Sequence, residues 1–177
     1  MASLFSFVLA LAVAFATTPA VKMLAIRIKA VDIPKDNRRM HKEPIPRAGG
    51  LAIFAGFLVG TLCFGALGPQ MKAILLGALL LVALGMVDDV VSLKPSIKFA
   101  GQIAAALIPV LSGVVVERFT NPFSPSGYLH LGVFSIPVTV IWIVGITNAV
   151  NFIDGLDGLA CGVSAIATIT MFVIAVM

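Results

Sequence analysis

The sequence predicts an all-α protein that crosses a membrane several times, and two observations carry this prediction. Of the 177 residues, 60% are hydrophobic and 11% are charged, whereas soluble domains carry about 25% charged residues. The apolar residues also form six runs, and crossing a hydrocarbon core of about 30 Å takes roughly 20 residues of helix. The formal net charge of +4 therefore gives no reason to expect a nucleic-acid partner.

The six predicted helices follow from these runs and from the turn residues between them, within a single integral membrane domain over residues 1–177. The first run is interpreted as a retained helix, because no basic region precedes it as in a signal peptide. Gly68 and Pro69 mark the turn after the second run. Alternation over residues 128–131 predicts a short β-hairpin before the fifth. The predicted spans cover residues 4–26, 49–67, 72–87, 99–116, 138–153 and 159–177.

Positive charge is concentrated in the loop 27–48, which holds seven of the twelve lysine and arginine residues. The positive-inside rule places such a loop in the cytoplasm. The following crossings bring residues 88–89 and 154–157 to the same side and put the hairpin segment 117–137 outside. Seven of the eight acidic residues, all except Glu117, therefore fall on the cytoplasmic face.

Asp88 and Asp89 end the third predicted helix, where the helix macrodipole disfavours each anion by about 0.3–1 kcal/mol. Lys94 and Lys98 in the following turn, or a divalent metal, would offset this cost. Carboxylates suit Mg²⁺, which binds through one or two of them together with substrate phosphates and water. The alternative is an acid pair at the interface that water and Lys94 satisfy.

A second polar segment, residues 148–159, lies at the end of the fifth run. Ionisable side chains near lipid are costly and usually face a cavity, a partner or an ion. Intervals of three residues place these side chains on one face if the helix continues, and Gly155 and Gly158 permit close backbone approach. The alternative is a polar helix end with solvated acids. The polar residues of this segment are Asn148, Asn151, Asp154 and Asp157.

The basic loop has features beyond its charge. Its prolines and the glycine pair 49–50 suggest a fixed loop that carries His41 and Arg47 at defined positions. His41 lies among cations, which makes it a candidate phosphate contact. A generic basic loop beside a membrane span is the alternative.

Three segments together resemble the polyprenyl-phosphate N-acetylhexosamine-1-phosphate transferases, a glycosyltransferase 4-type family. The resemblance covers about residue 20 to the C-terminus. Its Pro-x-Pro-Arg-x-Gly-Gly form is similar to the branch that primes O-antigen (lipopolysaccharide), teichoic acid or arabinogalactan synthesis with UDP-GlcNAc. The segments are Asp-x-Pro at 32 with His-x-x-Pro-x-Pro-Arg-x-Gly-Gly at 41, Gly-Met-x-Asp-Asp at 85 with Leu-x-Pro-x-x-Lys-Phe-x-x-Gln at 93, and Asn-Ala-x-Asn-Phe-x-Asp-Gly-Leu-Asp-Gly-Leu-Ala at 148.

The resemblance implies that a polyprenyl (undecaprenyl) phosphate oxygen attacks a UDP-sugar, so that GlcNAc-1-phosphate is transferred and UMP leaves. It also implies Mg²⁺ as the cofactor, with Mn²⁺ as a substitute. The implied catalytic residues are Asp88, Asp89, Asp154 and Asp157. The implied substrate-binding residues are His41, Lys42, Arg47, Lys98, Asn148 and Asn151. The implied metal ligands are Asp88, Asp89 and Asp154.

Members of this family have about ten or eleven transmembrane helices, so the chain resembles their N-terminal half. A downstream Gly-Asp-x-Gly-Ser segment with a magnesium-ligating aspartate and a histidine-rich loop do not occur in it, which implies that this chain alone carries part of an active site. The expected location is the bacterial cytoplasmic (inner) membrane with the site facing the cytoplasm, and a homodimer is an expected assembly.

Three other functions are the alternatives. Phospho-MurNAc-pentapeptide translocases belong to the same family but usually show Thr-Pro-Thr-Met-Gly-Gly in place of the proline-arginine motif. An intramembrane prenyltransferase would show Asp-Asp-x-x-Asp, but Ser92 stands at the last position. A cation transporter would favour acids near the bilayer midplane, whereas these lie at one face.

Overall fold

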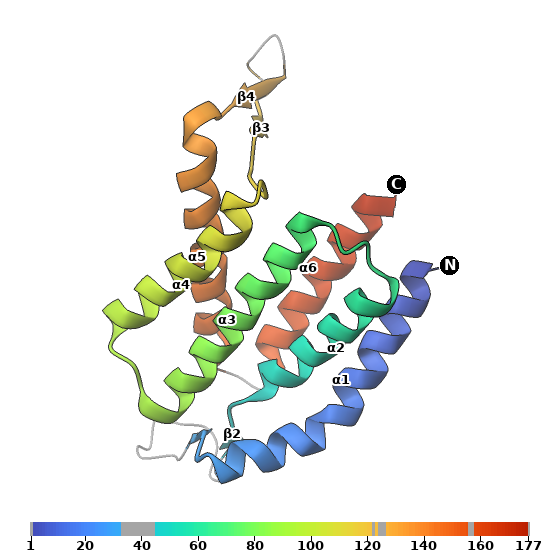
Figure 1. Ribbon diagram of the computed structural model, residues 1–177, viewed down its shortest axis with the longest axis vertical. Helices are drawn as coiled ribbons and strands as arrows, with labels where there is room; N and C mark the ends of the chain where they lie inside the picture. The colour runs from blue at the N-terminus through green and yellow to red at the C-terminus, as the bar shows by residue number, and fades with distance from the viewer. Residues whose placement is uncertain (1, 33–44, 122, 124–126, 156–157, 177) are drawn as a thin grey trace. The chain divides into compact units, whose positions relative to one another are not determined.

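The structure is a computed structural model that describes residues 2–32, 45–121, 123, 127–155 and 158–176. In these ranges it contains six α-helices, one short 3-10 helix and two two-stranded antiparallel sheets (Figure 1). The predicted all-α fold with a small hairpin is therefore confirmed. The chain divides into two compact units, Met1–Val114 and Val115–Met177.

The first unit contains two pairs of packed helices, α1 with α2 and α3 with α4. Helix α1 is bent (Figure 1), and it contains Pro19, a residue that bends helices because it removes a backbone donor. The elements of this unit are α1 (Ala2–Arg27), β1 (Val31–Asp32), β2 (Ile45–Pro46), α2 (Gly49–Phe64), α3 (Pro69–Val91) and α4 (Pro95–Leu111).

Small residues allow α1 and α2 to approach closely. Gly56 and Gly60 lie one helical turn apart on α2 and face Ala10 and Ser6 of α1. The Ser6 hydroxyl donates to the Gly60 carbonyl oxygen at 3.2 Å. Helices in membranes associate through such close backbone packing, because lipid removes the hydrophobic driving force between them.

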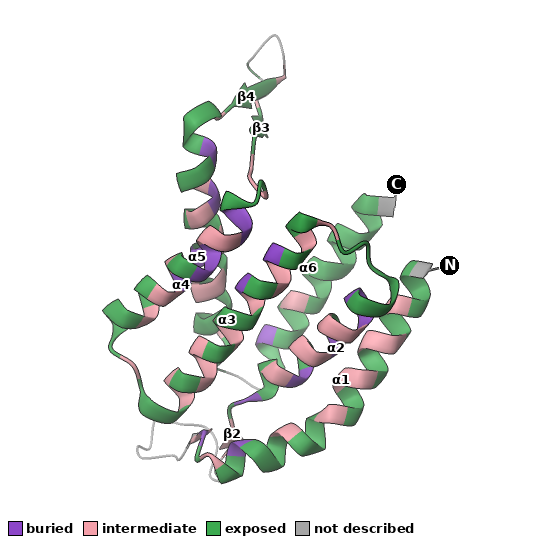
Figure 2. Ribbon diagram, viewed as in Figure 1, coloured by how far each residue is buried: buried purple, intermediate pink, exposed green. Residues whose placement is uncertain are grey.

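The burial pattern is reversed relative to a soluble protein. Ala105 is 1% exposed and Phe15 is 81% exposed, and most of the buried apolar residues are alanines while many large apolar side chains are exposed. Figure 2 shows where the buried and exposed positions lie along the helices. Such a surface would aggregate in water, but it is the expected surface for helices surrounded by lipid. The burial pattern therefore supports the membrane character that composition predicts.

Within the described residues, three helices are long and apolar enough to cross a membrane, namely Ser3–Arg27, Pro69–Val91 and Gly132–Ile153. The other three predicted spans are shorter apolar helices of 16 to 18 residues. Cys63 and Cys161 are both free and exposed.

Seven hydroxyl groups on or at the ends of the helices donate to a backbone carbonyl oxygen four residues earlier in the same helix. Each polar side chain is thereby satisfied without a partner helix. The residues that do this are Thr17, Thr18, Ser112, Thr139, Thr147, Thr168 and Thr170.

The second unit begins with a hairpin that is held beside the start of a long helix. The Val116 N–H donates to Thr139 Oγ1 at 2.8 Å, and the Leu131 N–H donates to the Glu117 carbonyl oxygen at 2.9 Å. Strands β3 and β4 confirm the predicted hairpin. The elements are β3 (Arg118–Thr120), β4 (Tyr128–His130), the 3-10 helix η1 (Gly132–Phe134), α5 (Ser135–Ile153) and α6 (Leu159–Val176).

Several predicted helix boundaries are wrong by about one turn. Helix α3 continues through Asp88 and Asp89 to Val91 instead of ending at residue 87. Helix α4 begins four residues earlier than predicted, at Pro95, because proline suits the first position of a helix, where no N–H is needed. It ends at Leu111 rather than at residue 116, and Gly113 follows with a φ of +93°. Helix α5 begins at Ser135, three residues early.

The basic loop contains a strand pair that the sequence did not predict. Val31 pairs with Pro46 and Asp32 with Ile45, and the Arg47 N–H donates to the Ala30 carbonyl oxygen at 3.0 Å. Two-residue strands carry too short a pattern to be recognised by alternation. The pairing nevertheless fixes both ends of the loop beside the C-terminus of α1.

We predict that Gly56→Ala lowers stability by about 1–3 kcal/mol, the usual cost of overpacking, because the new methyl group would meet the Ala10 carbonyl oxygen. Thermal unfolding in detergent measures the change. Gly85→Ala is the matched control, since a Cβ at that helical position meets nothing within 4 Å. Equal melting temperatures for the two variants would contradict close α1–α2 packing.

Candidate active site

The C-terminus of α3 holds a hydrogen-bonded polar arrangement. Asp88 lies in the last turn, and its two carboxylate oxygens have different partners. Oδ1 accepts the Leu93 N–H at 3.0 Å, and Oδ2 accepts from Lys98 Nζ at 2.8 Å. The Asp88 and Lys98 side chains are 22% and 24% exposed, so this ion pair is partly shielded from water.

The turn between α3 and α4 creates this arrangement. Ser92 follows α3 in the left-handed conformation with a φ of 53°, and its N–H donates to the Asp88 carbonyl oxygen at 2.8 Å. This conformation turns the chain so that the Leu93 N–H reaches the Asp88 side chain. Pro95 then starts α4, which brings Lys98 within its first turn. Sequence reasoning missed the Leu93 contact, because backbone amides leave no signal in residue type.

Each charge of the pair lies at the helix end that disfavours it. An anion at a helix C-terminus and a cation at a helix N-terminus each oppose the local dipole by about 0.3–1 kcal/mol. Asp88 and Lys98 therefore compensate one another. Of the two lysines that the sequence offered as partners, the structure selects Lys98 for Asp88, while Lys94 is exposed at the N-cap of α4. Asp89 is half-buried beside the pair.

The polar residues of the second unit lie at the C-terminal end of α5. Asn148 is half-buried and its Nδ2 donates to the Val144 carbonyl oxygen at 2.8 Å. Asn151 and Asp154 are exposed. Helix α5 ends at Ile153, and Asp154 is the C-cap with φ −81° and ψ 51°. The helix therefore ends before Asp154. The predicted shared helical face of Asp154 and the next acid would require the helix to continue.

The remaining predicted residues belong to the basic loop and to the segment after α5. Arg47 is exposed, and its backbone is fixed by the bond to Ala30. His41, Lys42 and Asp157 lie outside the described residues.

The side chains of this region can be compared with the ligands that the Mg²⁺ ion implied by the resemblance would need. No group of three His, Cys, Asp or Glu side chains close enough to hold a metal occurs in the described part of the chain. Mg²⁺ needs fewer than three protein ligands, because it keeps several bound waters and also binds substrate phosphates. Each carboxylate oxygen of Asp88 also retains a lone pair beyond its present hydrogen bond. The Asp88 carboxylate thus fits such a partial ligand set, and Asp89 is the next residue of α3.

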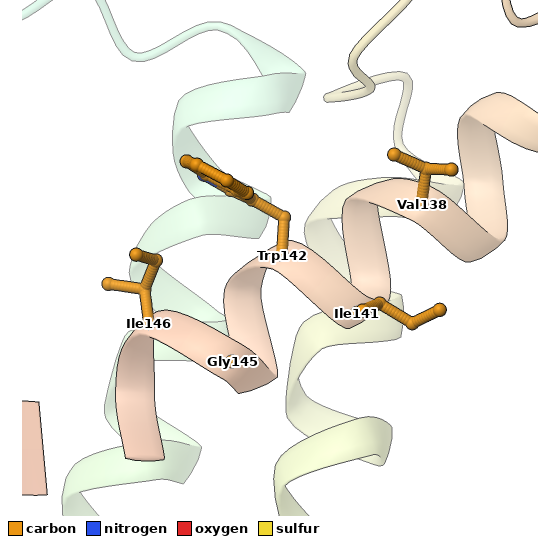
Figure 3. A pocket seen from close by; sticks show the side chains of 5 residues that line it. All are labelled: Val138, Ile141, Trp142, Gly145 and Ile146. Atoms are coloured by element: carbon orange, nitrogen blue, oxygen red, sulfur yellow. The ribbon is translucent and has the colours of Figure 1, made fainter. Parts of the chain in front are cut away.

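An open groove on α5 does not contribute to this chemistry. It has a volume of about 350 Å³ and lies on one helix, where Gly145 leaves a depression beside Trp142 and Ile146 (Figure 3). Val138 and Ile141 complete the lining. Because all these side chains are apolar, the groove offers no ligand for a phosphate or a metal.

The fold and these residues define a class, namely polytopic membrane proteins with carboxylates and a lysine at the ends of apolar helices. Comparison with known families then gives the particular family. Residues 71–177, more than half of the chain, match the family described as glycosyl transferase family 4. The chain belongs to this family, and the matched segment contains Asp88, Lys98 and Asp154.

Individual relatives support the same family. A probable undecaprenyl-phosphate N-acetylglucosaminyl 1-phosphate transferase of Bacillus subtilis is 44% identical over 96% of this chain and 47% of its own length. A decaprenyl-phosphate N-acetylglucosaminephosphotransferase of Mycobacterium tuberculosis is 39% identical over 89% of this chain and 41% of its own length. A phospho-N-acetylmuramoyl-pentapeptide-transferase of Chlorobaculum parvum is 31% identical over 79% of this chain and 42% of its own length. The chain spans about half the length of these curated relatives.

We predict that Asp88 and Lys98 are energetically coupled. In a double-mutant cycle with Asp88→Asn and Lys98→Met, unfolding in detergent should give a coupling free energy of about 0.5–3 kcal/mol, as for residues that share an ion pair. Asp88→Asn with Lys94→Met is the control, and additivity within about 0.5 kcal/mol is expected there. The same additivity for Asp88 and Lys98 would show that the pair contributes nothing.

Proposed function

We propose that the protein transfers a sugar-1-phosphate, GlcNAc-1-phosphate in the first instance, from a UDP-sugar to a polyprenyl phosphate and releases UMP. The observation that carries this proposal is the family match over residues 71–177, which includes both carboxylate-bearing helix ends. The names of the more similar relatives, from Bacillus and Mycobacterium, both specify a polyprenyl phosphate and N-acetylglucosamine. The substrates proposed here are those named substrates, with UDP as the sugar carrier.

The reaction exchanges one phosphoric anhydride for another. An oxygen of the lipid phosphate attacks the sugar-bearing phosphorus, the bond from that phosphorus to the bridging oxygen breaks, and UMP leaves with that oxygen. Little covalent assistance is needed, so catalysis rests mainly on positioning and on electrostatic stabilisation of the phosphoryl oxygens. A site made of carboxylates and lysines at helix ends suits this chemistry.

Asp88 is assigned to bind or deprotonate the lipid phosphate. Its contacts to Leu93 and Lys98 support this role, because they hold the carboxylate in one orientation. Lys98 has two further N–H donors beyond the one given to Asp88, and these can offset phosphate charge. Arg47 is exposed on a backbone that is fixed by its hydrogen bond to Ala30, and it is assigned to the same purpose together with His41 and Lys42.

Asn148, Asn151 and Asp154 are assigned to the nucleotide side of the reaction, with Asp157 in support. The exposure of Asn151 and Asp154 favours contact with a ligand. Asp88, Asp89 and Asp154 are proposed to bind Mg²⁺, or Mn²⁺ in its place. When bound, the metal would neutralise charge on the phosphates.

The proposed location is the bacterial inner membrane, with these residues on the cytoplasmic face and the hairpin outside. This orientation rests on the seven cations of the loop 27–48 and the positive-inside rule. The proposed role is an early membrane step in cell-envelope polysaccharide synthesis. The homodimer stays a prediction.

The second candidate is transfer of phospho-MurNAc-pentapeptide, and the match to the relative from Chlorobaculum parvum favours it. The identity to that relative is 31%, compared with 44% for the relative from Bacillus subtilis. A competition between UDP-GlcNAc and UDP-MurNAc-pentapeptide as donors distinguishes the two. We expect UMP release from UDP-GlcNAc.

We predict that Asp88→Asn and Asp154→Asn each reduce UMP release by about 10²–10⁴-fold, the usual range for a lost acid–base group. The assay uses the full-length protein with UDP-GlcNAc, undecaprenyl phosphate and Mg²⁺. Glu117→Gln is the matched control, because Glu117 is an exposed acid at the hairpin and should leave the rate unchanged. Near-normal turnover in either aspartate variant would remove that residue from the reaction.

We also predict that UMP release stops when a chelator removes divalent metal and returns when Mg²⁺ is added back in excess. Mn²⁺ should restore part of the rate, since both ions favour oxygen ligands. Undiminished release in the chelator would exclude a dissociable metal from the mechanism while leaving the assigned transfer intact.

A further inference from the structure

The β3–β4 hairpin has two chemically different faces. Phe119 lies directly opposite Leu129, and residues paired in this way project to the same side of the sheet. Successive residues along a strand alternate between the two sides. The opposite face therefore carries the flanking pairs, which are Arg118 with His130 and Thr120 with Tyr128.

The polar face has an internal contact, whereas the apolar face is open. The Arg118 guanidinium carbon lies 4.6 Å from the centroid of the Tyr128 ring, which is within the range of a cation–π interaction. Phe119 and Leu129 are 43% and 53% exposed. A two-stranded hairpin is only marginally stable in water by itself. Burial of its apolar face against lipid or protein would therefore stabilise it.

The hairpin lies at the level where a membrane-spanning helix begins. The apolar helical segment Gly132–Ile153 follows it directly. The Val116 N–H donates to the Thr139 side chain. Thr139 lies four residues after Ser135, the first residue of α5, and so about 6 Å along the helix axis at 1.5 Å per residue. Phe119 is three residues from Val116, and so at most about 10 Å away at 3.3 Å per residue. The interfacial layer between hydrocarbon and water is about 5–7 Å deep on each side.

Exposed apolar residues connect the hairpin to the surface of the helix. Val133 and Phe134 form the 3-10 turn between β4 and α5, and both are largely exposed. Phe119, Leu129 and these two residues share the apolar character of the exposed surface of α5. Continuity with that surface argues for lipid as the cover, and the arginine, tyrosine and histidine of the opposite face suit headgroups and water.

We propose that the apolar face of the hairpin, Phe119 and Leu129 together with Val133 and Phe134, rests in the interfacial layer of the bilayer and anchors the start of α5. The polar face then points toward phosphates and water. This role is separate from the proposed transferase function, because none of these residues is assigned to the reaction.

The test places an environment-sensitive fluorophore on either face. The full-length protein, with its cysteines including Cys63 and Cys161 replaced by serine, carries Phe119→Cys or the adjacent Thr120→Cys labelled with a nitrobenzoxadiazole. It is reconstituted in vesicles of phosphatidylethanolamine and phosphatidylglycerol. We expect several-fold stronger quenching at residue 119 than at residue 120 by lipids with a nitroxide near the headgroup, and the reverse order for aqueous iodide.

A second pair of variants guards against disruption by the label. Leu129→Cys projects to the same side as residue 119, and His130→Cys to the opposite side, so they should reproduce the contrast. Equal lipid quenching on both faces would overturn the proposal. Protection of residues 119 and 129 from both quenchers would also overturn it, because the cover would then be protein, such as a second copy of the chain.

Discussion

The ion pair between Asp88 and Lys98 is the interaction on which the first unit's polar site depends. It joins the end of α3 to the beginning of α4 at 2.8 Å, and it places a negative charge where a positive one would be more stable. The reverse arrangement would gain from both helix dipoles. The observed order therefore gives up some stability, and what it supplies is a carboxylate held in one orientation at a helix end. The proposed transfer of a phosphoryl group would use a carboxylate of that kind.

The rest of the first unit is built so that this turn has a rigid base. Gly77 of α3 faces Ala105 and Pro109 of α4, and Gly101 faces Leu84, so the two helices approach closely before they reach the turn. Close contact of small residues is the main source of helix association in lipid. A rigid pair of helices limits the positions that Asp88 and Lys98 can take, which favours a preorganised site.

The fold was largely predictable from the sequence, since apolar run length and charge asymmetry do not depend on tertiary contacts. Helix ends were less predictable. Asp88 and Asp89 suggested an end at residue 87, because anions oppose the dipole at a helix C-terminus. The sequence offered Lys94 and Lys98 as partners, but it did not show that Lys98 would pair with Asp88 inside the last turn of the helix. The left-handed Ser92 and the strand pair at Val31 and Pro46 depend on backbone geometry that residue type does not encode. The polar residues 148–154 were recognised from their position in an apolar run, but the C-cap conformation of Asp154 was not.

The self-satisfied hydroxyl groups bear on how such a chain enters a membrane. Thr147 and Thr168 each donate to a carbonyl oxygen of the same helix. The free-energy cost of placing these hydroxyl groups in lipid is therefore reduced as soon as that helix forms. A helix of this kind can leave the translocation machinery for lipid before any neighbour has been synthesised. Asp88 differs, because its partner Lys98 arrives ten residues later. The α3–α4 pair therefore gains from entering the bilayer as a hairpin.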